Sequence, residues 1–98
     1  MYQEWQDLLR LTQGKDFLIE RIRLKQQDVA IEGKFLIPPL AKLSEADQIF
    51  IAAFVRAHGS IKKMETFFGL SYPSIKNRLR QLSESLDFVD VAVESAST

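Results

Sequence analysis

The chain of 98 residues is long enough for one compact domain and too short for two ordinary ones. Hydrophobic residues make up 46% and charged residues 27% of it, which indicates a folded protein rather than a disordered one. Thirteen basic side chains balance thirteen acidic ones, and the absence of cysteine excludes disulfides and thiolate metal sites. With no long apolar run and no recognisable secretory signal, we expect a cytoplasmic protein without a membrane partner.

The first 37 residues predict a helix followed by a β-hairpin. Residues 2–13 carry apolar side chains in a polar background, which is typical of a short amphipathic helix, and Gly14 would end it. Residues 17–24 and 29–37 are rich in branched and aromatic side chains and flank a polar turn, which indicates two antiparallel strands. Because two strands alone are marginal in water, we expect the hairpin to pack on a helix or on a second chain.

Residues 38–43 begin with two prolines and predict a linker, after which the apolar spacing becomes helical. The residues expected to begin or end the three helices that follow are Ser44, His58-Gly59, Ser60, Gly69 and Ser71. Residues 44–90 therefore predict a trihelical helix-turn-helix, with a recognition helix at 72–86, and residues 91–98 an acidic flexible tail. The fold class predicted for the whole chain is α+β.

Apolar side chains predict which faces of these helices are buried. In the last helix they recur at spacings of four, three and four, namely Ile75, Leu79, Leu82 and Leu86. The first helix is apolar on nearly every side. We assign one stripe to the trihelical core, namely Ala46, Ile49, Phe50, Ala53, Phe54 and Ala57. A second partner should cover the other side, namely Ile51, Ala52 and Val55, while Leu70 should fill the corner between the last two helices.

Basic side chains are concentrated in the second half of the chain. Between residues 44 and 83, six Lys and Arg residues face three Asp and Glu residues, whereas every charged side chain from residue 84 onward is acidic. A basic segment on a helix-turn-helix is typical of proteins that bind nucleic acid. We therefore expect double-stranded DNA as the partner, and a function in transcriptional regulation.

The helical wheel of residues 72–86 gives candidate DNA contacts. The base-contact candidates lie on or near the side opposite the apolar stripe, namely Ser74, Asn77, Arg80 and Gln81. Amide and guanidinium groups match adenine and guanine edges in the major groove. The candidates for phosphate contacts are Lys62, Lys63, Ser71, Tyr72, Lys76 and Arg78.

The alternative function is a protein–protein adaptor that has kept the helix-turn-helix fold without binding DNA, an interpretation that the zero net charge favours. An enzyme is not expected, because the sequence contains neither a paired-carboxylate arrangement nor a nucleotide-binding loop, and His58 is the single histidine. We also expect no cofactor, no metal site and no small-molecule ligand.

Three stretches, residues 31–35, 43–45 and 69–79, resemble an uncharacterised bacterial and archaeal family of small proteins. Its members have an N-terminal zinc ribbon and a C-terminal helix-turn-helix, and the Ser71-Tyr72-Pro73 start of the last helix is the most specific part of the likeness. The resemblance covers roughly residues 10–86. The helix-turn-helix is also similar to the C-terminal modules of sigma factors and to Fis-type proteins, which have apolar residues at the positions of Ile75 and Leu79.

The chain departs from that family at the metal site. The two cysteine pairs of the family would fall at Arg10 and Gln13 and at Leu24 and Gln27, none of which ligates zinc. The resemblance therefore implies a degenerate ribbon that keeps the hairpin without the metal. Since zinc would contribute folding free energy, packing must replace it. We expect the N-terminal segment to act in dimerisation, giving a homodimer.

Overall fold

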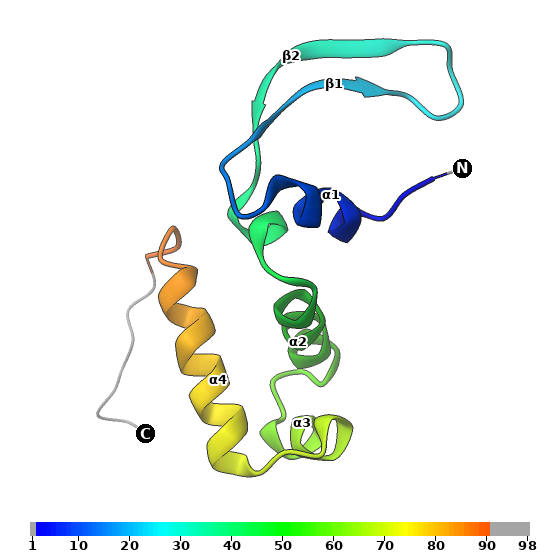
Figure 1. The fold of residues 1–98 in the computed structure, drawn as a ribbon. Helices are drawn as coiled ribbons and strands as arrows, with labels where there is room; N and C mark the ends of the chain where they lie inside the picture. The colour runs from blue at the N-terminus through cyan, green and yellow to red at the C-terminus, as the bar shows by residue number, and fades with distance from the viewer. Residues whose placement is uncertain (1, 91–98) are drawn as a thin grey trace. The chain divides into compact units, whose positions relative to one another are not determined.

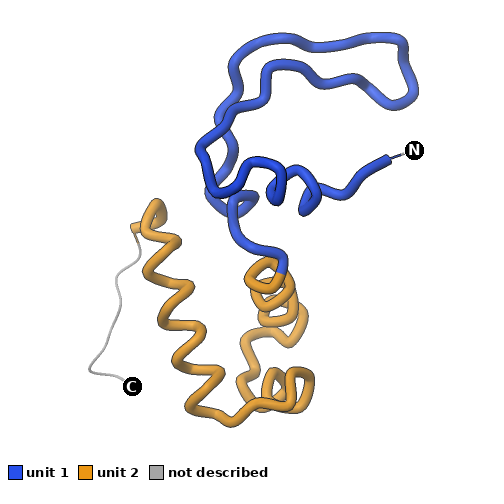
Figure 2. The backbone as a smooth tube through the Cα atoms, in the orientation of Figure 1, with its two compact units in different colours: residues 1–45 blue, residues 46–98 orange. Residues whose placement is uncertain are grey.

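The computed structural model describes residues 2–90 and divides into two compact units, residues 1–45 and 46–98 (Figure 2). The elements in chain order are α1 (Trp5–Thr12), β1 (Leu18–Arg23), β2 (Ala30–Leu36), the short 3-10 helix η1 (Pro39–Lys42), α2 (Glu45–Arg56), α3 (Ile61–Phe68) and α4 (Tyr72–Ser85) (Figure 1). The fold is α+β, as the sequence predicts. The tail predicted at residues 91–98 lies outside the described residues.

In the first unit, α1 is fixed at both ends and along its side. The backbone N–H of Glu4 donates to the Asp7 carboxylate at 2.9 Å, which satisfies a donor at the start of the helix. Gln13 ends the helix with a left-handed φ of 54°. The indole N–H of Trp5 donates to the Ala41 carbonyl at 2.7 Å, and its ring lies 6.1 Å from that of Phe17. Trp5 thus joins α1 to the two segments that flank the hairpin.

β1 and β2 form the predicted antiparallel hairpin. Leu18 pairs with Leu36 and Ile22 with Ile31, while the register shifts by one residue between these pairs. Paired residues share a face of the sheet, and Leu18 and Ile22 lie four positions apart on the same strand. These four side chains therefore form one face, which we call the aliphatic face, and all four are exposed in the single chain.

The second unit holds a small core to which all three helices contribute. Its fully buried side chains are Phe50 from α2, Met64 from α3 and Ile75 from α4, with Leu82 almost completely buried beside them. The Phe50 ring stacks on that of Phe68 at a centroid distance of 5.2 Å. The burial predicted for the apolar stripe of α4 is thus confirmed at Ile75 and Leu82.

The helix ends predicted at Ser60, Gly69 and Ser71 are confirmed by their local geometry, whereas α1 ends at Gln13, one residue before the predicted Gly14. The Ser60 hydroxyl accepts a hydrogen bond from the N–H of Lys63 at 3.2 Å, and the Ser71 hydroxyl accepts one from the N–H of Ser74 at 3.4 Å. Gly69 ends α3 with a φ of 65°, the left-handed conformation that glycine adopts without steric cost. These caps determine where α3 stops and α4 starts.

Part of the predicted packing of α2 is wrong. Ile49, assigned to the core, is 50% exposed, whereas Ile51, assigned to a second partner, packs against the core. Ala46 is exposed as well. The reason is that α2 is apolar on several sides, so periodicity alone does not choose the side against which α3 and α4 pack. Leu70, expected to fill the corner between α3 and α4, is 40% exposed.

Candidate nucleic-acid interface

The helix-turn-helix consists of α3, the turn at residues 69–71 and α4 (Figure 1). The backbone N–H of Gly69 donates to the Glu65 carbonyl at 2.8 Å, and the N–H of Leu70 donates to the same carbonyl at 3.3 Å. The turn is therefore held by the last turn of α3. Pro73 lies in the first turn of α4, where its missing N–H leaves no hydrogen bond unmade.

The four base-contact candidates are exposed on α4, namely Ser74, Asn77, Arg80 and Gln81. Two of them are linked, because the Arg80 guanidinium donates to the side-chain oxygen of Asn77. The same guanidinium lies 3.5 Å from the carboxylate of Glu84, in an ion pair whose two side chains are 64% and 69% exposed. Exposed pairs of this kind are worth about 0–1 kcal/mol, so they can be exchanged for contacts with a ligand.

Five of the six phosphate candidates are also exposed, namely Lys62, Lys63, Ser71, Tyr72 and Lys76. The lysines come from α3 and α4. Ser71 has a local role as well, because its hydroxyl caps α4 and donates to the hydroxyl of Ser74 at 3.0 Å. The structure thus presents these groups to solvent on the two helices of the motif.

Arg78 differs from the other candidates because it is held within the helical unit. Its guanidinium lies 3.0 Å from the Asp47 carboxylate on α2 and 4.9 Å from the centroid of the Phe50 ring. The side chains of Arg78 and Asp47 are each about one-third exposed. This geometry gives Arg78 a packing role between α4 and α2. The helical wheel did not predict that role, since Asp47 lies 31 positions away in the sequence.

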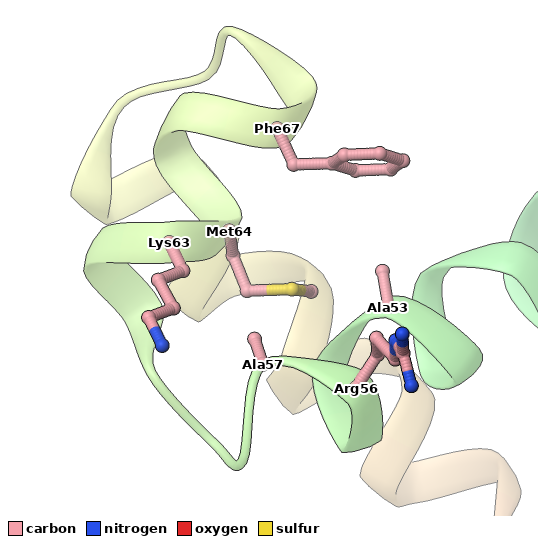
Figure 3. Close-up of a pocket in the computed structure, with 6 residues that line it drawn as sticks. All are labelled: Ala53, Arg56, Ala57, Lys63, Met64 and Phe67. Carbon is pink, nitrogen blue, oxygen red and sulfur yellow. The ribbon is translucent and has the colours of Figure 1, made fainter.

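A groove between α2 and α3 was not predicted from the sequence. It has a volume of about 310 Å³, and Figure 3 shows the residues that line it, namely Ala53, Arg56, Ala57, Lys63, Met64 and Phe67. A second hollow adjoins it through two shared residues, Lys63 and Phe67, and adds Lys62 and Thr66. We call the two hollows together the α2–α3 groove. The sequence signal that points to it is the pair Lys62-Lys63, which precedes Phe67 by about one helical turn. The structure leaves the Phe67 side chain 67% exposed.

At the four positions where the resemblance implies zinc-binding cysteines, the side chains do not fit zinc. Arg10 forms an ion pair with Asp7, Leu24 has no ligand atom, and Gln13 and Gln27 carry neutral amides rather than the Cys, His or carboxylate ligands of zinc. Within the described range, residues 2–90, no group of three or more His, Cys, Asp or Glu side chains could hold a metal ion. Over the same range, every helix is too short or too polar to cross a membrane.

Comparison with known proteins matches part of the chain to a protein family. Residues 43–89 match the family described as Domain of unknown function (DUF2089)-HTH, and this segment contains α2, α3 and α4. Neither a curated protein nor a solved structure gives a significant match. The likeness of the N-terminal unit to a zinc ribbon, and that of the motif to sigma-factor and Fis-type modules, stay predictions. The C-terminal part of the chain is a helix-turn-helix.

Proposed function

We propose that the protein binds double-stranded DNA through α4 and acts in transcriptional regulation, by binding rather than by catalysis. The observation that supports this most directly is the exposed polar face of α4, which starts at a tight turn and carries Asn77 and Arg80. In a helix-turn-helix, the first residues of the second helix reach base edges in the major groove. Asn77 would pair with adenine and Arg80 with guanine.

The remaining exposed cations fit the phosphate backbone. Lys62 and Lys63 lie in the first turn of α3, and Lys76 lies on α4, so both helices of the motif can contact phosphates. Such contacts fix the position of the protein on the duplex without reading its sequence. Arg78 is left out of this set, because it is paired with Asp47 and packs on Phe50.

The test compares specific with non-specific binding. The full chain is titrated by fluorescence anisotropy against a random duplex and against duplexes recovered by selection, at low and moderate salt. We expect both affinities to fall with salt. Asn77→Ala and Arg80→Ala should each lower the affinity for selected DNA by about 1–3 kcal/mol. Asn77→Ala should leave the affinity for random DNA nearly unchanged, since it removes no charge.

The matched control is Gln3→Ala combined with Arg10→Ala, which removes one amide and one guanidinium from exposed positions in the first unit. This control should bind selected DNA like the wild type. If the wild type fails to bind DNA even at low salt, the proposal is wrong and the adaptor function becomes the better explanation.

We further propose that the chain is a homodimer joined through the aliphatic face of its hairpin. A two-stranded sheet is marginal in water unless its apolar face is covered, and in the single chain this face is exposed. A dimer would also supply two recognition helices for two half-sites. We expect a sedimentation mass of twice the 11.2 kDa of one chain.

Two double variants test this interface. Ile22→Lys with Ile31→Glu replaces a cross-strand apolar pair by an ion pair, so the hairpin keeps a favourable pair while the aliphatic face becomes charged. This variant should sediment as a monomer. Arg21→Glu with Glu32→Arg exchanges the charges of a cross-strand pair outside the aliphatic face and should remain a dimer. A wild-type mass equal to one chain would contradict the proposal.

A further inference from the structure

The α2–α3 groove is an apolar hollow with a cationic rim. Ala53, Ala57 and Met64 line one hollow with apolar groups (Figure 3), and the exposed ring of Phe67 lines both hollows that make up the groove. Arg56 lines one hollow, Lys62 the other, and Lys63 both. A ligand that fits this surface combines apolar side chains with negative charge, and it is long enough to reach both hollows.

The chain itself contains a segment with those properties. Residues 86–90 follow α4 and read Leu-Asp-Phe-Val-Asp. Phe88 and Val89 are each 53% exposed, and the acidic residues on either side of them, Asp87 and Asp90, are exposed too. We call residues 86–90 the acidic segment. The apolar side chains of Phe88 and Val89 are complementary to the apolar lining of the groove. The carboxylates of Asp87 and Asp90 are complementary in charge to its cationic rim.

Within one chain, α4 leads the acidic segment away from α3, which forms one side of the groove (Figure 1). Arg78 of α4 pairs with Asp47 in the first turn of α2, whereas the groove is formed at Ala53–Ala57, near the last turn. α4 starts at the turn after α3 and is about 21 Å long over its 14 residues. Its C-terminal end therefore lies away from α3 (Figure 1). A neighbouring molecule can therefore supply the segment more easily than the same chain can.

We propose that the α2–α3 groove binds the acidic segment of a second copy of this chain. Phe88 of one copy packs beside Phe67 of the other, and Asp87 and Asp90 face the cationic rim. This contact needs neither DNA nor the hairpin interface. Because Lys62 and Lys63 belong to the cationic rim, they are paired with the acidic segment when the groove is occupied. At high protein concentration these two lysines are therefore less available to other anions.

The test is a disulfide formed between two variants, and because the natural chain has no cysteine, the introduced residues supply all the thiols. Thr66→Cys places a thiol at the groove, and Val89→Cys places one in the acidic segment. Full-length chains of the two variants, one carrying a mass tag, are mixed and oxidised without DNA. We expect a covalent heterodimer in severalfold higher yield than from the control pair Val55→Cys and Val89→Cys, because exposed Val55 lies on α2 outside the groove.

Further substitutions in the cysteine variants identify the contact. Phe67→Ser and Phe88→Ser each alter an exposed side chain, so we expect the fold to be retained, and each should reduce the heterodimer to the level of the control pair. Lys63→Glu should reduce it as well, and Asp87→Lys in the other chain should restore it by inverting the ion pair. Equal yields from the groove pair and the control pair would overturn the proposal, whatever the chain does with DNA.

Discussion

Replacing Phe50 by alanine is expected to lower the free energy of unfolding of the helical unit by about 3–5 kcal/mol. Phe50 is fully buried, stacks on Phe68 and carries the Arg78 guanidinium over its ring. The substitution therefore leaves a cavity at the centre of a core with few buried side chains, and it removes the surface on which Arg78 rests. Urea unfolding followed by circular dichroism measures the loss as a lower midpoint with an unchanged slope.

The matched control for this prediction is Val55→Ala, also on α2. Val55 is 67% exposed, so its replacement should change the free energy of unfolding by no more than about 0.5 kcal/mol. A Phe50→Ala protein whose stability falls within about 1 kcal/mol of the wild type would mean that the three helices do not pack around this ring.

The helix ends could be predicted from the sequence because they depend on local chemistry. A serine hydroxyl reaches an N–H three residues away, and Gly69 adopts a backbone conformation that other residues avoid. The hairpin could be predicted for the same reason, since its two strands adjoin a short polar turn. These features do not require knowledge of residues far away in the chain.

The buried side of α2 could not be predicted in the same way. A helical wheel identifies an apolar stripe, but α2 has apolar side chains around most of its circumference. Whether Ile49 or Ile51 joins the core depends on where α3 and α4 lie, which is long-range information. The same limit applies to Arg78, whose partner Asp47 is on another helix.

The candidate site was predictable to the extent that it lies on one helix. Asn77 and Arg80 share a face of α4 because three positions bring side chains onto the same side of a helix, and the structure presents both to solvent. The α2–α3 groove was not predictable, since its floor and rim come from two helices whose packing the sequence does not state. Charge and spacing therefore predict which residues share a face of one helix, whereas a hollow between two helices can be identified only once the fold is known.

Neutralising Lys62, Lys63 and Lys76 together is expected to make DNA binding much less dependent on salt. Each lysine that neutralises a phosphate contributes roughly −0.9 to the slope of log affinity against log salt concentration, so the Lys→Gln triple variant should lose about 2.7 from that slope. The affinities of variant and wild type should differ most at low salt and approach each other near about 1 M, where the Debye length is only about 3 Å. Anisotropy titrations at several salt concentrations measure both effects.

A second triple variant distinguishes the effect of direct phosphate contacts from the effect of the protein's net charge. Lys15→Gln, Lys34→Gln and Lys42→Gln remove the same charge from exposed positions in the first unit. If phosphates are neutralised by contact with α3 and α4, this control keeps the wild-type slope, because counterions are released only where a cation replaces them on the duplex. If the slope changed equally in both variants, the overall charge of the protein would govern its attraction to DNA, and the proposed interface on the helix-turn-helix would be wrong.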